Sequence, residues 1–195
     1  MENDIRRMKA QEFKDIFNRI ERDFARGEYA SFDVLYQQLQ DGIQEGLVFC
    51  KGEHDVAYSI CTAGDATGYV LISLFAVYEG FRGGGIGSAF LKELCKIYSD
   101  RKGIIVEVEK PENSQIQKER VKRAKRIEFY KKAGFYLIPN INYSIWDVPM
   151  HLMVFSHSTS MQTINEIIGQ IMYEIYMELM GKRLIHKMKF EIVNK

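Results

Sequence analysis

The chain has 195 residues, 46% of them hydrophobic and 27% charged, and a formal net charge of +1. This length predicts one domain with a sizeable core, and a charge near zero argues against a protein that binds nucleic acids or membrane surfaces. No apolar run is long enough to span a bilayer, and the first residues, Met1–Asp4, lack the basic and apolar regions of a signal peptide. Because Cys50, Cys61 and Cys95 show neither a disulfide framework nor a metal-ligand spacing, we expect a soluble cytoplasmic protein.

The first part of the sequence predicts a strand, two helices and a hairpin. Residues Asp4–Lys9 form a short candidate strand. Apolar residues recur at helical spacing through Gln11–Ala25, and again after Ser31, whose side chain suits the N-cap of a second helix. Leu47–Lys51 and Val56–Thr62 flank a turn and predict an antiparallel hairpin.

The stretch from Val70 to Tyr98 organises the chain. A continuous apolar run, Val70–Tyr78, leads into a glycine-dense turn, Arg82–Gly87, after which apolar residues recur at helical spacing. This change of period predicts a strand, a turn and a helix. Glycines can take positive φ angles and let the backbone approach a ligand closely. The first amides of a helix lack partners within it and lie at its positive end, so such a turn suits a phosphate.

After this helix the sequence predicts a strand at Ile104–Glu109, with Ile104, Val106 and Val108 on one face and Ile105, Glu107 and Glu109 on the other. Gln115–Ala133 predicts a basic helix that ends at Gly134, a residue typical of helix C-termini. Phe135–Ile138 predicts another strand.

The last part of the sequence predicts an irregular segment at Asn140–Asp147, a strand at Val148–Ser156, and a helix at Met161–Met180 that ends at Gly181. The helix carries an apolar stripe wider than one face usually needs. Two interpretations stay open: the stripe packs on the chain's own domain, or it forms a homodimer contact through residues 161–180.

The glycine turn resembles the signature of a known family. A P-loop would need a lysine in the turn, and the glycines lack the spacing of a dinucleotide-binding fingerprint. Arg82–Gly87 instead resembles the R/Q-x-x-G-x-G/A signature of the GNAT acetyltransferase superfamily. Arg126–Phe135 resembles a second GNAT segment, F-Y-x-x-x-G-F, and it follows in the expected order. The resemblance covers roughly Ile5 to Ser156.

The resemblance implies an α/β (α+β) fold: a central mixed, largely antiparallel, splayed sheet flanked by helices, plus a C-terminal helix. The expected domains are a GNAT acetyltransferase domain at residues 1–156 and a C-terminal helical extension at residues 157–195. The implied reaction transfers the acetyl group of acetyl-CoA to a primary amine of a small molecule or peptide by direct attack, without a metal. The residues expected to bind acetyl-CoA lie at the end of the central strand and in the turn: Phe75, Ala76, Val77, Arg82, Gly83, Gly84, Gly85, Ile86, Gly87 and Ser88.

The family also implies catalytic roles. Tyr130 aligns with a tyrosine that lies near the cofactor sulfur in many members, so we predict that it protonates the departing thiolate; the alternative is a tyrosine of the core. Several members use a glutamate on the central strand as base, but Tyr69–Tyr78 contains no acidic residue. We therefore predict Glu107 as the base, directly or through water, with Glu109 or water alone as alternatives. A carboxylate paired with a lysine is an equally open interpretation of Glu107.

Other interpretations concern function as a whole. The missing acid on the central strand favours a non-catalytic CoA-binding or sensor module as the alternative to an enzyme. The basic run Lys118–Lys132 could bind a nucleic acid, although near-zero net charge argues against it and a solvated helix face is typical of such a run. The acceptor is not identified by the sequence, but the family places its site near four aromatic candidates: Phe32, Tyr36, Tyr143 and Trp146.

Overall fold

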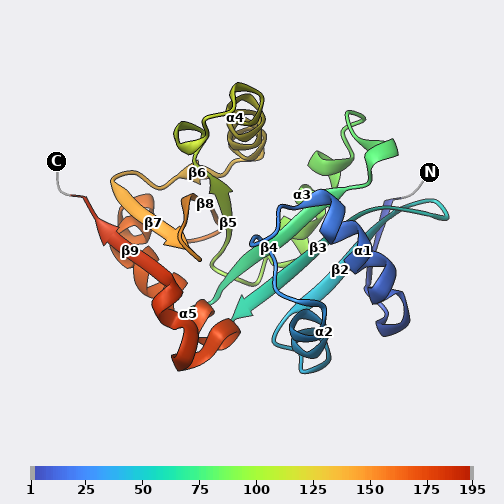
Figure 1. Ribbon diagram of the computed structural model, residues 1–195, viewed down its shortest axis with the longest axis horizontal. Helices are drawn as coiled ribbons and strands as arrows, with labels where there is room; N and C mark the ends of the chain where they lie inside the picture. Colours follow the sequence, from blue (N-terminus) through green and yellow to red (C-terminus); the bar gives the residue numbers. More distant parts are fainter. Residues whose placement is uncertain (1–2, 194–195) are drawn as a thin grey trace. The chain divides into compact units, whose positions relative to one another are not determined.

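Figure 1 shows the computed structural model, which describes residues 3–193. The outer ends of the expected domain ranges, residues 1–2 and 194–195, lie outside this part. The chain divides into two compact units, the first made of Met1–Ala63 and Ile72–Leu94 and the second of Gly64–Leu71 and Cys95–Lys195. Each unit has its own hydrophobic core.

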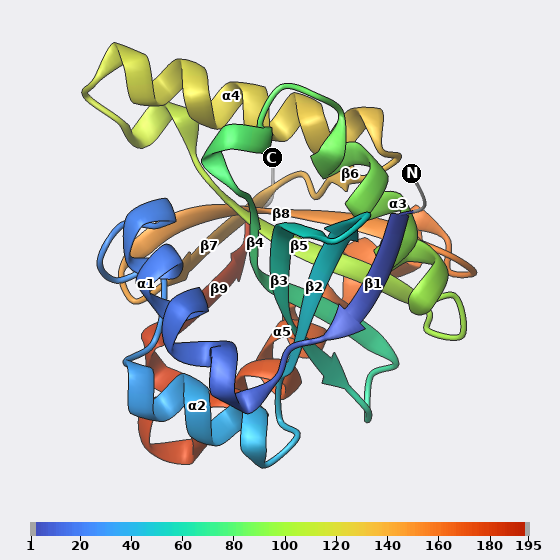
Figure 2. The ribbon, with the colours of Figure 1, turned by 90° about the vertical axis from the view of Figure 1, so that its right-hand side faces the viewer.

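The first unit combines helices with antiparallel strands, which Figure 2 shows side by side for its first three strands. Its elements, two of which run on into the second unit, are β1 (Asn3–Arg7), η1 (Ala10–Glu12), α1 (Phe13–Asp23), α2 (Phe32–Gln40), β2 (Glu45–Lys51), β3 (His54–Gly64), β4 (Tyr69–Val77), η2 (Glu79–Phe81) and α3 (Ile86–Ile97). β1 pairs with β2 and β2 with β3, both antiparallel. The predicted strand, two helices and hairpin are therefore confirmed, and so are the central strand and the helix after the glycine turn.

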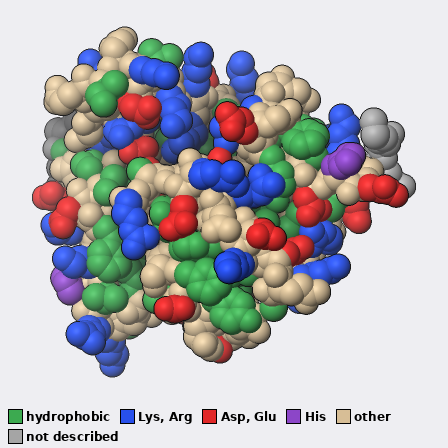
Figure 3. All heavy atoms as spheres, turned by 45° about the vertical axis from the view of Figure 1, so that its right-hand side comes forward, with side chains coloured by type: hydrophobic (Ala, Val, Ile, Leu, Met, Phe, Trp, Pro, Cys, Tyr) green, Lys and Arg blue, Asp and Glu red, His purple; other side chains and the backbone are tan. Residues whose placement is uncertain are grey.

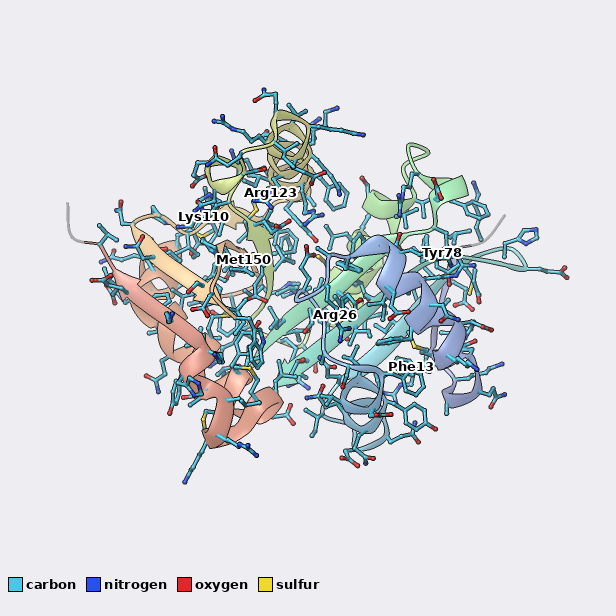
Figure 4. All side chains as sticks on the ribbon, in the orientation of Figure 1. Phe13, Arg26, Tyr78, Lys110, Arg123 and Met150 are labelled. Carbon is cyan, nitrogen blue, oxygen red and sulfur yellow. The ribbon has the colours of Figure 1, made fainter. Side chains whose placement is uncertain are left out.

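The core of the first unit follows from the helical spacing of its apolar residues. Phe13, Ile16, Phe17 and Ile20 lie on one face of α1 and are all buried. They pack with apolar side chains of β3, β4 and α2 in one cluster, in which Phe13 is labelled in Figure 4. Burial of each large apolar side chain contributes about 1.5–3 kcal/mol, so this face holds α1 against the strands.

The second unit contains the start of β4, the remaining strands and the two long helices. Its further elements are β5 (Gly103–Glu109), η3 (Pro111–Asn113), α4 (Gln117–Lys132), β6 (Tyr136–Leu137), β7 (Ile141–Ile145), β8 (Val148–Ser156), α5 (Met161–Leu184), η4 (Ile185–Lys187) and β9 (Met188–Ile192). β8 pairs with β5, β6 and β7, and β7 also pairs with β9, all antiparallel. The expected α/β fold, with a largely antiparallel sheet flanked by helices and a C-terminal helix, is confirmed.

The prediction of an irregular segment at Asn140–Asp147 is wrong, because most of it is strand β7. Ile145 pairs with Val148, so β7 and β8 form a hairpin whose turn is Trp146 and Asp147. Both turn residues have positive φ, 51° and 61°, as the tightest hairpin turns require. Tryptophan is unusual there, where asparagine, aspartate and glycine are preferred, so the pair Trp146-Asp147 does not form a recognised turn motif.

Helix α5 uses its apolar stripe inside the second unit. Ile168 and Ile175 are fully buried, and they pack with the strands in the same core cluster. Gly181 takes φ 65° and ψ 176°, which interrupts the helix where the sequence predicts its end. The stripe is therefore explained by packing within the chain. Within residues 3–193, no helix has the length and apolar character needed to cross a membrane.

Candidate functional site

The glycine turn lies between β4 and α3 in the first unit. Gly83 and Gly85 have φ of 83° and 77°, in the left-handed region that other residues rarely adopt. A Cβ atom built on either glycine meets no atom within 4 Å. The turn therefore needs glycine for its backbone conformation, and the space beside these two residues is not filled by protein.

The turn presents the first amides of α3. The helix ladder begins where the amide of Ala89 donates to the carbonyl of Gly85, at 3.0 Å. The amides of Ile86, Gly87 and Ser88 come before it, in the first turn, where a helix offers them no carbonyl. They lie at the positive end of the helix dipole, which favours an anion such as a phosphate.

Arg82, the first residue of the glycine turn, connects the turn to other residues of the first unit. Its Nε donates to the carbonyl oxygen of Val77 at 2.9 Å, and its guanidinium forms an ion pair with Asp23 at the end of α1. The other carboxylate oxygen of Asp23 accepts a hydrogen bond from the hydroxyl of Tyr58 at 3.2 Å, and burial together with Asp23 raises the pKa of Tyr58. The sequence analysis missed Asp23, which no motif marks.

Phe75, one of the strand residues predicted to contact acetyl-CoA, packs α3 against β4. The ring of Phe75 stacks on Phe90 of α3, with centroids 5.2 Å apart, and Phe90 stacks in turn on Phe49 of β2, at 5.0 Å. Ala76 lies on the opposite face of the strand, in the core with α1. Because Phe90 is fully buried, these rings hold the start of α3, and hence the glycine turn, at the end of β4.

Tyr130 lies on α4 in the second unit and is 6% exposed. Its ring contacts Phe135, with centroids 5.4 Å apart, and Phe135 contacts Phe155 of β8, at 5.6 Å. Phe155 pairs in register with Ile104 of β5, so both side chains point to the same face of this strand pair. Tyr130 therefore lies on the face of β5 that carries Ile104, Val106 and Val108.

Glu107 lies on the opposite face of β5, with α5. Its Oε1 accepts a hydrogen bond from the hydroxyl of Tyr143 on β7, and its Oε2 accepts one from the hydroxyl of Tyr176 on α5, at 2.8 Å. Burial raises the pKa of Glu107, and the two phenols act in the opposite direction because they stabilise the ionised carboxylate. The predicted partner, a lysine, is not what holds this carboxylate.

The predicted acid and base are thus on opposite faces of β5. The structure does not bring Glu107 and Tyr130 into contact, and the predicted chemistry does not require it, since one would act on the attacking amine and the other on the leaving thiolate. Glu109, the alternative base, forms an ion pair with Arg123 of α4. Tyr143, expected to wall an acceptor site, is only 2% exposed, so that prediction is wrong for this residue.

The basic helix α4 is partly neutralised by neighbouring acids. Arg123, labelled in Figure 4, binds Glu109 and also donates to the carbonyl oxygen of Lys110 at 3.1 Å. Lys131 pairs with Glu128 at 2.9 Å. On the face shown in Figure 3, acidic side chains are interspersed among the basic ones. This arrangement matches the solvated helix face rather than a continuous surface for a nucleic acid.

Comparison with known proteins agrees with this geometry. Residues 44–137 match the family model described as an acetyltransferase (GNAT) domain. The match is thus to a GNAT acetyltransferase domain over this range. Every residue predicted to bind acetyl-CoA or to act in catalysis lies within the matched range, whereas Asp23, Tyr143 and Tyr176 lie outside it.

Solved structures share the fold of this chain. A protein assigned to the GNAT family from Bacteroides thetaiotaomicron superposes with a TM-score of 0.73 at 21% identity, over 91% of this chain and 98% of its own. A dodecameric spermidine N-acetyltransferase from Vibrio cholerae gives 0.60 at 12% identity, over 80% and 94%. The ribosomal-protein-S18-alanine N-acetyltransferase from Escherichia coli gives 0.58 at 17% identity, over 82% and 96%. A search of curated proteins finds no matching relative.

The four aromatic residues expected near an acceptor site differ in their surroundings. Phe32 and Tyr36 stack on α2, with ring planes 7° apart and centroids at 5.7 Å. Trp146 is 43% exposed, and the Lys187 ammonium lies 5.9 Å from its ring centroid. Within residues 3–193, no group of three His, Cys, Asp or Glu side chains is arranged to hold a metal ion.

Proposed function

We propose that this protein is an acetyl-CoA-dependent N-acetyltransferase that acts on a primary amine by direct attack. The observation that carries the proposal is the glycine turn, which combines left-handed Gly83 and Gly85, unfilled space beside them and the first amides of α3. These amides would hold the pyrophosphate of acetyl-CoA. The backbone of Phe75–Val77 would lie along the acyl arm, as the family resemblance implies.

The reaction needs three things from the protein. The nitrogen–carbon bond forms as the free amine attacks the acetyl carbonyl, and the carbon–sulfur bond then breaks. Glu107 would take the first proton from the substrate ammonium, and a backbone amide in Phe75–Val77 would donate to the oxyanion. Tyr130 would protonate the thiolate, and the second proton that the nitrogen loses as the amide forms would restore the Tyr130 phenol. A buried carboxylate with a raised pKa is a better proton acceptor near neutral pH than an exposed one, which supports the role of Glu107.

The acceptor class rests on the amine chemistry of the family. The similar solved structures include an enzyme named for spermidine and one named for the alanine of a ribosomal protein, a small polyamine and a peptide amine. We propose an acceptor from these two classes, a primary amine of a small molecule or of a peptide. The stacked pair of Phe32 and Tyr36 in the first unit would suit a cationic amine, since cations favour aromatic faces.

Substitution in the turn tests acetyl-CoA binding. Gly84 does not have a left-handed φ, and its built Cβ approaches only the carbonyl oxygen of Phe81, at 3.9 Å. Gly84→Val therefore adds a branched side chain without the backbone strain that Gly85→Val would bring. We expect acetyl-CoA affinity, measured by calorimetry, to fall at least about tenfold in Gly84→Val. Gly80→Val, outside the turn and equally open, is the matched control. Equal affinities in wild type and Gly84→Val would refute the proposed site.

The second candidate function is a CoA-binding sensor without catalysis, favoured by the absence of an acidic residue on β4. Release of free thiol from acetyl-CoA in the presence of a panel of polyamines and peptides separates the two. Turnover that depends on the amine supports the enzyme, whereas tight binding without turnover across the panel supports the sensor.

We also propose a cytoplasmic location, which is supported by Cys50, Cys61 and Cys95 remaining as thiols rather than forming disulfides. A homodimer through residues 161–180 would have to use what α5 leaves exposed, mainly Ile167 and Tyr173, since Ile168 and Ile175 are buried in the unit core. Light scattering at high protein concentration tests it, and a monomer there rules it out.

A further inference from the structure

The carboxylate of Glu107 is held by two phenols that no motif connects to it. Tyr143 comes from β7 and Tyr176 from α5, and each donates to a different carboxylate oxygen. The two tyrosines are 2% and 8% exposed, so their hydroxyls have little access to water as an alternative partner. Both lie outside residues 44–137, the range that matches the family model.

We propose that Tyr143 and Tyr176 are positioning residues that orient Glu107 and keep it ionised as the base, an inference that rests on the proposed function. An ionised carboxylate can accept about four hydrogen bonds, so two phenols leave it able to receive a proton from a substrate. Burial alone favours the protonated form, which cannot act as a base, and hydrogen bonds to the ionised form counteract this. Phenols do so without placing a positive charge beside the carboxylate.

Within residues 3–193, the side chains that hydrogen-bond to Glu107 are the two phenols. On β8 the residue opposite it is Leu152, and the next titratable group on that strand, His151, is opposite Val108. On β5 itself, Glu109 is bound by Arg123 of α4. Removing a phenol should therefore act on Glu107 directly.

The test is the pH profile of acetyl transfer in Tyr143→Phe and Tyr176→Phe. Phenylalanine keeps the buried ring and removes only the donor. A base must be ionised to act, so kcat/KM rises with pH around the pKa of the base, and this rise is the acidic limb of the profile. Because loss of a hydrogen-bond donor raises the pKa of Glu107, it moves the acidic limb to higher pH. We expect a shift of about one pH unit in each variant, which is about a tenfold lower rate on the limb and a wild-type rate above it.

Tyr136→Phe is the matched control. The Tyr136 hydroxyl also reaches α5, at the Met161 carbonyl oxygen (3.5 Å) and the Asn165 side chain (3.4 Å), but does not contact Glu107. Tyr136→Phe should therefore leave the acidic limb of the pH profile at its wild-type position. An equal loss of rate at all pH values in the two test variants, or an unmoved limb, would show that the phenols are only structural and would overturn the inference.

A second measurement separates this inference from the proposed function. Carboxyl ¹³C NMR of labelled glutamate, assigned with Glu107→Gln, reports the titration of Glu107 whether or not the protein is active. If the titration shifts in the tyrosine variants but the acidic limb does not, the positioning role is wrong and the acetyltransferase stands. If wild type transfers no acetyl group to any amine, the proposed function itself falls.

Discussion

The left-handed glycines of the turn allow backbone strain to be measured on its own. In Gly85→Ala the new Cβ meets no atom within 4 Å, so steric overlap contributes nothing. The φ of 77° remains, and it costs an L-residue about 1–2 kcal/mol. Against this, replacing any glycine by alanine stabilises by about 0.4–1 kcal/mol, because the unfolded chain loses freedom.

Gly80→Ala measures the stabilisation that comes from the reduced freedom of the unfolded chain, without backbone strain. Gly80 also has no atom within 4 Å of its built Cβ, but its φ is not left-handed. The difference between the free energies of unfolding of the two variants should therefore equal the strain, about 1–2 kcal/mol. Gly83→Ala, with φ 83°, should behave like Gly85→Ala.

Urea denaturation provides the measurement. With an m-value of about 1–3 kcal/mol/M, the Gly85→Ala midpoint should lie roughly 0.3–2 M below that of Gly80→Ala, at an unchanged m-value. Coincident midpoints for the two variants would mean that the turn does not hold its left-handed conformation in solution. The argument for close backbone approach to a phosphate would then lose its basis.

Three further predictions follow from single contacts. Tyr130→Phe should lower kcat by about 10²–10⁴-fold with unchanged acetyl-CoA affinity if its phenol protonates the thiolate. If kcat, measured by thiol release with a rate-limiting chemical step, is unchanged, Tyr130 has only a structural role. Gly169→Ala should destabilise the protein by about 1–3 kcal/mol, because its Cβ would lie 2.5 Å from the Phe190 ring. In thermal unfolding, adding Phe190→Leu to Gly169→Ala should restore part of this loss, and simply additive effects of the two substitutions would contradict the contact. Burial lowers the pKa of His151 despite the facing Glu112, so the stability that neutral His151 contributes is present above about pH 6.5 and is lost as pH falls below this value through the lowered pKa of the folded state. His151→Gln should flatten the fall in the free energy of unfolding below about pH 6.5, and parallel curves for the variant and wild type would refute this.

Much of the fold could be predicted because its signals are local. The β8 strand has the predicted bounds, Val148–Ser156, and α3 and the end of α5 at Gly181 follow from periodicity and a glycine stop. The glycine turn is also predicted by local sequence, because glycine adopts left-handed φ angles much more readily than other residues do. Such features depend on neighbouring residues and not on the rest of the chain.

The missed elements depend on pairing across long separations. β9 is a short strand that is stabilised by β7, with Tyr143 opposite Phe190. Neither strand shows a turn signal that would have linked it to its neighbour. In the candidate site, the ion pair of Arg82 with Asp23 and the hydrogen bond of Glu107 with Tyr176 likewise join distant parts of the sequence. Because Tyr176 lies in an apolar stripe, the sequence predicts only that it is a core residue, although a buried tyrosine hydroxyl needs a hydrogen-bond partner.

The two carboxylates of β5 show why the kind of partner matters more than burial. Glu109 is bound by the guanidinium of Arg123, so its carboxylate is engaged in an ion pair with α4. Glu107 is bound by two neutral phenols, which orient it and support its ionised form while leaving it able to accept a proton. Residues two apart on one strand thus have environments suited to different roles, a structural ion pair and a base. This contrast favours Glu107 over Glu109 as the base, and it predicts that Glu109→Gln changes stability while leaving the acidic limb of the rate profile in place.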